Sequence, residues 1–195
     1  MNDRIVILGI AGSLRKGSFN QAALRAATSL APDNAEIEIY DIDGFPGYND
    51  DLISDPPAKV TEFKKKIREA DAILFSSPEY NYSIPGVLKN AIDWTSRPYG
   101  DSAWEGKPAA IMGASPGAIG TARMQYHLRQ VMVFLNMFPL NRPEVMIGNC
   151  TEKFDSQGNL TDENTAEYVR RMLEALVDWT IKLKGEKSAA RTTQQ

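Results

Sequence analysis

The stretch from residue 5 to residue 20, IVILGIAGSLRKGSFN, limits the possible folds of this chain more than any other. Its apolar start, Ile5 to Ile10, is rich in β-branched residues and is typical of a strand buried on both faces of a parallel sheet. A turn of small polar residues follows, and a helix rich in alanine and leucine is expected from Asn20 to Leu30. Because free backbone N–H groups at a helix N-terminus bind anions, this strand–turn–helix unit predicts a phosphate site.

Four side chains in and beside this turn suit a phosphate group. Ser13, Ser18 and Asn20 can donate hydrogen bonds, and Arg15 can form a charge-assisted pair. The alternative is an ordinary strand–helix turn in which the serine and the asparagine only cap the helix. We favour the phosphate interpretation because all four side chains fall within residues 13–20.

Two common nucleotide motifs are absent from the turn. A Walker P-loop, GxxxxGK[ST], needs a lysine directly after its second glycine, but Ser18 follows Gly17. Gly9 and Gly12, with their neighbours, do not form the dinucleotide motif GxGxxG. The turn therefore indicates neither ATP hydrolysis nor a Rossmann NAD domain.

The remaining chain alternates between predicted strands and predicted helices. Strands are expected at 5–10, 35–40, 72–76, 109–114 and 143–147. Helices are expected at 20–30, 57–70, 85–95, 121–137 and 162–183. This alternation predicts an α/β fold, a doubly wound parallel sheet of five strands with helices on both faces. We expect a single domain over residues 1–185 and a disordered tail over 186–195.

Three unusual loops, 11–18, 78–84 and 115–120, each follow a predicted strand. They should meet at the carboxyl edge of the sheet, where doubly wound folds bind ligands. Backbone amides of the second loop can bind the edge of a heterocycle, and its tyrosines can cover the ring face. The glycines of the third loop let the backbone approach a flat ligand. A phosphate together with a flat polar ring outlines a mononucleotide such as FMN.

Some residues of these loops also have simpler explanations. Tyr80 and Tyr82 could pack under their loop, although we expect at least one of them near the ligand. Glu79 could act as a general acid, but a lone loop carboxylate is more often structural or solvated. No acid–base catalytic group is therefore predicted.

The composition excludes several classes of function. With 22 basic and 25 acidic residues, the net charge is −3, which does not suggest nucleic-acid binding. One histidine, His127, and one cysteine, Cys150, cannot form a usual zinc site or an internal disulfide. No apolar stretch is long enough to cross a membrane. A reducing, cytoplasmic location and no membrane partner are expected.

Three segments resemble the NAD(P)H-dependent FMN reductase family, whose members include flavodoxin-like bacterial quinone and chromate reductases. They are GSLRKGSFN at 12–20, PEYNYSIPGVLKNAIDW at 78–94 and GTARMQYHLRQ at 120–130. The resemblance implies that FMN is the cofactor and is held by three loops. The implied phosphate-binding residues are Ser13, Arg15, Ser18, Phe19 and Asn20. The implied contacts to the flavin and ribityl chain are Pro78, Glu79, Tyr80, Asn81 and Tyr82, with Ser115, Gly117 and Gly120 from the third loop.

The resemblance also implies an activity and its substrates. NADPH or NADH would reduce the flavin, and quinones, free flavins, azo compounds or chromate-type metal oxyanions would then take two electrons in a ping-pong sequence. The flavin carries this chemistry, so no catalytic side chain is expected. Two alternatives stay open: a flavodoxin-like electron carrier, and a nonenzymatic FMN-binding module. The sequence indicates neither the preferred nicotinamide cofactor nor the physiological acceptor.

A homodimer or homotetramer is expected, in part from the helix at 121–137. Its apolar residues cover more than the single stripe needed to face a sheet, and Arg123, Tyr126 and His127 can share a polar cluster. Met, Tyr and Arg are enriched at subunit contacts. The alternative is a helix packed on both sides within one subunit.

Overall fold

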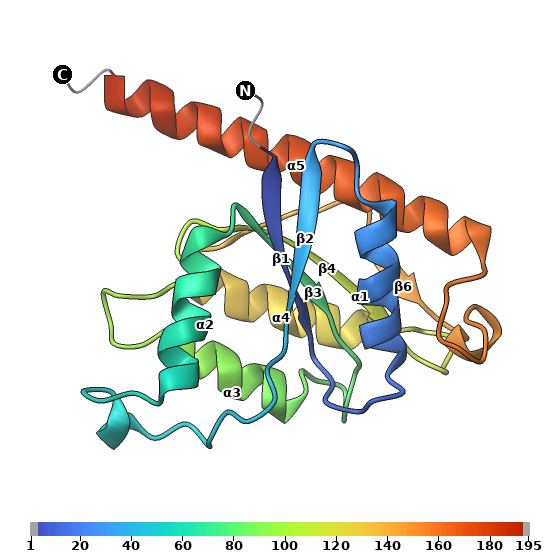
Figure 1. Ribbon diagram of the computed structural model, residues 1–195, viewed down its shortest axis with the longest axis horizontal. Coiled ribbons are helices and arrows are strands. Elements are labelled where there is room, and N and C mark those ends of the chain that lie inside the picture. The colour runs from blue at the N-terminus through green and yellow to red at the C-terminus, as the bar shows by residue number, and fades with distance from the viewer. Residues whose placement is uncertain (1–3, 193–195) are drawn as a thin grey trace.

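The computed structural model describes the backbone of residues 4–192 and the side chains of residues 4–185. Its sheet is parallel, in the order β2-β1-β3-β4-β5, and β6 also pairs with β4 (Figure 1). The strands are β1 (Ile5–Ala11), β2 (Ala35–Tyr40), β3 (Ala72–Ser76), β4 (Pro108–Ala114), β5 (Phe138–Pro139) and β6 (Val145–Ile147). The chain moves to one side of β1 for β2 and to the other for β3, so the switch point lies at β1 and β3.

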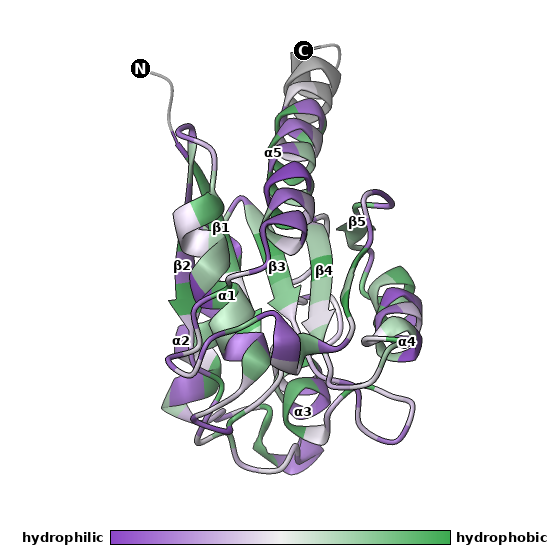
Figure 2. Ribbon diagram, turned by 90° about the vertical axis from the view of Figure 1, so that its right-hand side faces the viewer, coloured by the Kyte–Doolittle hydropathy of each residue, from purple (hydrophilic) through white to green (hydrophobic). Residues whose placement is uncertain are grey.

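Helices cover both faces of the sheet (Figure 1). They are α1 (Phe19–Leu30), α2 (Ala58–Glu69), α3 (Gly86–Thr95), α4 (Ala122–Phe134) and α5 (Glu163–Thr192), with short 3₁₀ helices η1 (Asp50–Leu52) and η2 (Cys150–Glu152). One hydrophobic core contains α1 and α5, and the other contains α2, α3 and α4. In Figure 2, α5 alternates hydrophilic and hydrophobic colours, as expected of a helix with one buried face. The predicted doubly wound α/β fold is confirmed.

The strand patterns explain the sheet order. β1, β3 and β4 are almost continuously apolar, and both of their faces are buried beneath helices. β2 alternates polar and apolar residues and lies at the edge of the sheet, as predicted. Apolar runs therefore occupy the centre, and the alternating strand can leave half of its side chains in solvent.

The fifth position of the sheet differs from the prediction. Instead of one strand over 143–147, two short strands share the place beside β4: β5 pairs with its start and β6 with its end. Helix α4 ends at Phe134 rather than at residue 137, and Asn136 then adopts a left-handed backbone conformation, with φ of 53°. The chain can thus turn into β5 directly after the helix.

The last helix also differs from the prediction. It was expected to end at residue 183, but α5 continues to Thr192. The segment 186–195 was predicted to be a disordered tail. Its backbone is helical as far as Thr192, and residues 193–195 lie outside the described part of the chain.

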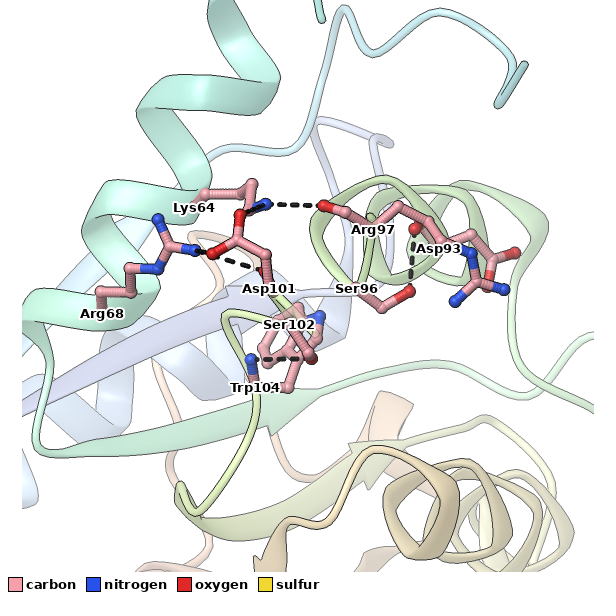
Figure 3. Close-up of polar contacts among 8 residues, drawn as sticks. All are labelled: Lys64, Arg68, Asp93, Ser96, Arg97, Asp101, Ser102 and Trp104. Carbon is pink, nitrogen blue, oxygen red and sulfur yellow. Dashed lines mark hydrogen bonds and ion pairs between the residues drawn. The ribbon is translucent and has the colours of Figure 1, made fainter. Parts of the chain in front are cut away.

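One lysine of α2 is unexpectedly buried. The Lys64 residue is only 8% exposed. Its ammonium group donates to the Asp101 carboxylate at 2.7 Å and to the carbonyl oxygen of Arg97 at 2.6 Å (Figure 3). Arg68 also donates to the Asp101 carboxylate, at 2.5 Å. Two cations of α2 therefore hold the loop between α3 and β4 against that helix.

Candidate functional site

A cavity of about 280 Å³ opens at the carboxyl edge of the sheet, among the loops that follow β1, β3 and β4. Nine of the predicted contact residues line it: Ser13, Arg15, Ser18, Phe19, Asn20, Pro78, Glu79, Tyr80 and Ser115. The structure therefore brings together three loops that are distant in the sequence. Ala114 and Pro116 also line the cavity, and sequence reasoning missed them although they flank Ser115.

The first loop presents free backbone donors. The N–H groups of Ser13, Leu14, Lys16, Gly17 and Phe19 make no hydrogen bond within the described part of the chain. They precede or begin α1, whose N-terminus carries partial positive charge. Such an arrangement of donors binds phosphate.

Two side chains of this loop have distinct local roles. Ser18 is the N-cap of α1, and its Oγ accepts from the N–H groups of Asn20 and Gln21. Arg15 is exposed, and its Nη2 donates to the carbonyl oxygen of Gly17 at 2.8 Å. Ser18 therefore shapes the loop and also lines the cavity, whereas the Arg15 guanidinium can turn toward an anion at little structural cost.

Asn20 is committed to the protein itself. Its Nδ2 donates to the carbonyl oxygen of Ala114 at 2.9 Å, and its Oδ1 accepts from the Ala114 N–H at 2.8 Å. The residue is 3% exposed. The side chain thus ties the start of α1 to the end of β4.

The second loop is a tight turn in which Tyr80 and Ser83 pair through two backbone hydrogen bonds of 3.0 and 3.1 Å. Both central residues are left-handed: Asn81 has φ of 51° and Tyr82 has φ of 66°. This is the pattern of a type I′ turn. Tyr80 borders the cavity, but Asn81 and Tyr82 lie outside its lining.

Glu79 reaches from the second loop to α4. Its side chain is 6% exposed, and its carboxylate accepts from Arg123 Nε at 2.5 Å and from the Met124 N–H at 3.1 Å. The Arg123 guanidinium also lies 3.8 Å from the centroid of the Tyr82 ring. This carboxylate therefore has a structural role at the N-terminus of α4. Sequence reasoning missed this contact because residues 79 and 123 are far apart in the chain.

The third loop is held against the end of β6 and by the Ser115 side chain. Ser115 donates its N–H to Ile147 and accepts from the Gly117 N–H through its Oγ. Gly120 has φ of 67° and packs against Met146. Gly117 and Gly120 do not line the cavity, so their contact with a cofactor stays a prediction.

Two glycines below the loops permit close approach of backbone segments. A Cβ atom on Gly12 would collide with the Ser77 side chain. A Cβ atom on Gly113 would collide with Thr121 Oγ1 and with the carbonyl oxygen of Ser77. Both positions therefore require glycine for the three loops to meet.

Other reactive residues do not form a second site of the usual kinds. Burial raises the pKa of the Cys150 thiol, which keeps it in its unreactive protonated form. No group of three His, Cys, Asp or Glu residues that could hold a metal occurs among the described residues. None of the helices within residues 4–192 is long and apolar enough to span a bilayer.

The fold and the three-loop cavity define a flavodoxin-like nucleotide-binding protein. Comparison with known families gives a more specific result: the family described as NADPH-dependent FMN reductase matches residues 5–152. The chain belongs to this family.

The sequence similarity to individual relatives extends over most of the chain. It is 54% identical to an NAD(P)H-dependent FMN reductase of Pseudomonas aeruginosa, over 95% of this chain and 100% of the relative. It is 45% identical to a 2-hydroxy-1,4-benzoquinone reductase of a Burkholderia species, over 87% and 93%. Among solved structures, the flavoenzyme FerB of Paracoccus denitrificans, an NAD(P)H:(acceptor) oxidoreductase, has a TM-score of 0.85 at 40% identity, covering 91% of this chain and 98% of FerB.

Membership of the family makes FMN the cofactor, with NADPH or NADH as co-substrate. The residues present fit this group. Ser13 and Phe19, which have free N–H donors, line the cavity together with Tyr80 and Glu79 of the second loop. The chain is therefore an oxidoreductase of the FMN reductase and quinone reductase family.

Proposed function

We propose that this protein transfers two electrons from NADPH or NADH, through FMN, to quinones, with free flavins, azo compounds and chromate-type oxyanions as further acceptors. The observation that carries the proposal is the convergence of a phosphate cradle with two further loops on one cavity. FMN supplies the electron-transfer chemistry when it is bound. The side chains around it have no general acid–base role in the proposal, since Glu79 is engaged with α4.

The residues of the cavity have separate parts in binding. The free N–H groups of residues 13–19, the Ser13 and Ser18 hydroxyls and the Arg15 guanidinium hold the phosphate. Residues 78–80 and 115–116 orient the flavin and its ribityl chain. Contacts from Asn81, Tyr82, Gly117 and Gly120 are part of the same proposal. The backbone groups near the ring can stabilise negative charge on it, as fixed dipoles do in other enzymes.

We also propose that donor and acceptor use the same place in turn. The sequence holds no second nucleotide motif of the GxGxxG type near its strands, so a separate dinucleotide site has no support. This predicts ping-pong kinetics, with parallel lines in double-reciprocal plots at several quinone concentrations. Intersecting lines would contradict shared use of the site.

An assembly of two or four copies is part of the proposal. On the outer face of α4, Tyr126, Val133 and Phe134 are 54%, 78% and 70% exposed. Large apolar side chains gathered on one helix face suit a subunit contact. Light scattering at micromolar concentration tests this, and a mass of one subunit would contradict it.

The alternatives differ in turnover. A flavodoxin-like electron carrier would bind FMN without oxidising NAD(P)H, and such carriers tend to be strongly acidic, unlike this chain with its net charge of −3. A nonenzymatic FMN-binding module would show no turnover with any quinone.

A cytoplasmic location is supported by the single buried cysteine, which suits a reducing compartment.

The deciding experiment is the absorbance spectrum of the purified protein. We expect a yellow protein that releases FMN rather than FAD on heating. Adding NADPH or NADH without oxygen should bleach the flavin band, and adding a quinone should restore it. A colourless protein that fails to bind added FMN would refute the proposal.

A further inference from the structure

Three residues of helix α4 contact the second loop. Its residue Arg123 and the Met124 N–H bind the Glu79 carboxylate, and the Arg123 guanidinium also covers the Tyr82 ring. One turn further along α4, His127 Nδ1 lies 2.8 Å from Ser83 Oγ. The loop that borders the cavity is thus attached along its length to a helix that does not itself line the cavity.

The loop needs such attachment because of its backbone. Asn81 and Tyr82 are both left-handed, and this conformation is uncommon for a bulky residue such as tyrosine. Strained conformations persist where surrounding contacts hold them, and they are frequent at ligand sites. Within the loop itself, the Tyr80–Ser83 pairing supplies only two hydrogen bonds. The contacts with α4 supply the further interactions that hold the turn in this conformation.

The negative charge of Glu79 also indicates that the second loop needs its contacts with α4. Glu79 is nearly buried and lines the cavity, so an unpaired carboxylate there would be unfavourable. Arg123 and the positive N-terminus of α4 both neutralise it. Removing the guanidinium would therefore loosen the loop and leave the Glu79 carboxylate bound by the Met124 N–H alone, beside a ligand whose reduction adds negative charge.

We infer that Arg123 is a positioning residue for the flavin end of the site: through Glu79 and Tyr82 it holds the turn 79–83 in its binding conformation. It makes no contact with the cavity and acts only through these two residues. The inference rests on the proposed function, because it takes the ligand of the cavity to be FMN.

Riboflavin, which lacks the phosphate, separates this role from the phosphate cradle. In Arg123→Ala, FMN and riboflavin should both bind about tenfold more weakly, the effect of losing one charge-assisted hydrogen bond. In Arg15→Ala, only FMN binding should weaken. Arg123→Lys, which keeps the charge but loses the planar guanidinium, should be intermediate. The midpoint potential of bound flavin should become more negative in Arg123→Ala.

Arg123 and Glu79 should also act on riboflavin binding as one unit. If Arg123 acts through Glu79, the double variant Glu79→Gln/Arg123→Ala should bind riboflavin no more weakly than Arg123→Ala alone. Arg170→Ala removes an arginine whose ion pairs lie on the exposed side of α5 and should match the wild type. Circular dichroism of each apoprotein confirms that binding is measured on folded protein.

The outcomes distinguish this inference from the proposed function. If the wild-type protein binds no FMN, the proposed function itself fails. If the wild type binds FMN but Arg123→Ala binds riboflavin within twofold of it, the positioning role is wrong. Weaker binding of FMN with unchanged binding of riboflavin would also overturn it, since Arg123 would then act on the phosphate.

Discussion

The Asn20 side chain and the Ala114 backbone form a closed pair of hydrogen bonds, 2.9 Å and 2.8 Å long, that joins the first and third loops of the site. Asn20 lies in the first turn of α1, which follows β1, and Ala114 is the last residue of β4. The pair therefore crosses β3, the strand between β1 and β4, at the carboxyl edge of the sheet. An asparagine amide suits this role because it offers one donor and one acceptor side by side.

This pair gives the first prediction. Asn20→Ala should lower the free energy of unfolding by about 2–4 kcal/mol, because it leaves two buried backbone groups of Ala114 unpaired. Asn20→Asp should also destabilise the protein, since a carboxylate cannot donate to the Ala114 carbonyl oxygen. Urea denaturation of the apoprotein is the measurement. A midpoint equal to that of the wild type would show that the pair contributes little.

The phosphate cradle gives the second prediction. Arg15→Ala should weaken FMN binding by about 1.5–3 kcal/mol and Ser18→Ala by about 0.5–1.5 kcal/mol. The two should differ in stability: Ser18→Ala also loses the N-cap of α1, at about 1 kcal/mol, whereas Arg15 is exposed. Fluorescence titration with FMN and thermal unfolding measure the two effects. Lys16→Ala, in the same loop but outside the cavity lining, is the matched control.

The close approach of Gly113 gives the third prediction. Gly113→Ala should destabilise the fold by about 1–3 kcal/mol, as overpacking does in other cores. Removing the Thr121 hydroxyl in Gly113→Ala/Thr121→Val should not restore stability, because the carbonyl oxygen of Ser77 still blocks the new Cβ. Gly17→Ala is the control, since a Cβ there meets nothing within 4 Å. Equal melting temperatures for the two alanine variants would contradict this explanation.

The loop between α3 and β4 gives the fourth prediction, which concerns pH. The hydrogen bond from Lys64 lowers the pKa of Asp101 in the folded protein. A carboxyl group with a lowered folded-state pKa stabilises the protein above its ordinary pKa of about 3.9, and this contribution is lost as the pH falls through the lowered value. The Asp101→Asn variant should therefore be less stable than the wild type at pH 7. On acidification from there to about pH 3, it should lose less stability than the wild type loses. Parallel pH profiles for the two proteins would contradict the role of the pair.

The lone histidine gives the fifth prediction. His127 meets Ser83 near the protein surface, and a hydrogen bond between exposed groups contributes about 0.5–1.5 kcal/mol at most. His127→Ala should therefore weaken FMN binding by no more than about tenfold. The rate of flavin reduction by saturating NADPH should stay within about twofold, because no proton transfer is assigned to the imidazole. Stopped-flow absorbance measures this rate, and a loss of hundredfold or more would make His127 part of the chemistry.

The sequence by itself determined the parallel sheet, the edge position of β2 and the three loops that build the cavity. It could do so because these features follow from local patterns: apolar runs, alternation, and small polar residues after strands. It assigned Ser18 to the phosphate loop, and the structure adds that this serine caps α1.

Only the tertiary structure decided how several side chains are used. Asn20 was predicted as a phosphate donor, yet both ends of its amide are bound to Ala114. Lys64 is buried, and its ammonium group donates to the Asp101 carboxylate. Glu79 binds the N-terminus of α4 through contacts with residues 123 and 124. Each of these partners is more than 30 positions away in the chain, so no local pattern in the sequence records the pairing, and the folded backbone alone brings the groups within hydrogen-bonding distance.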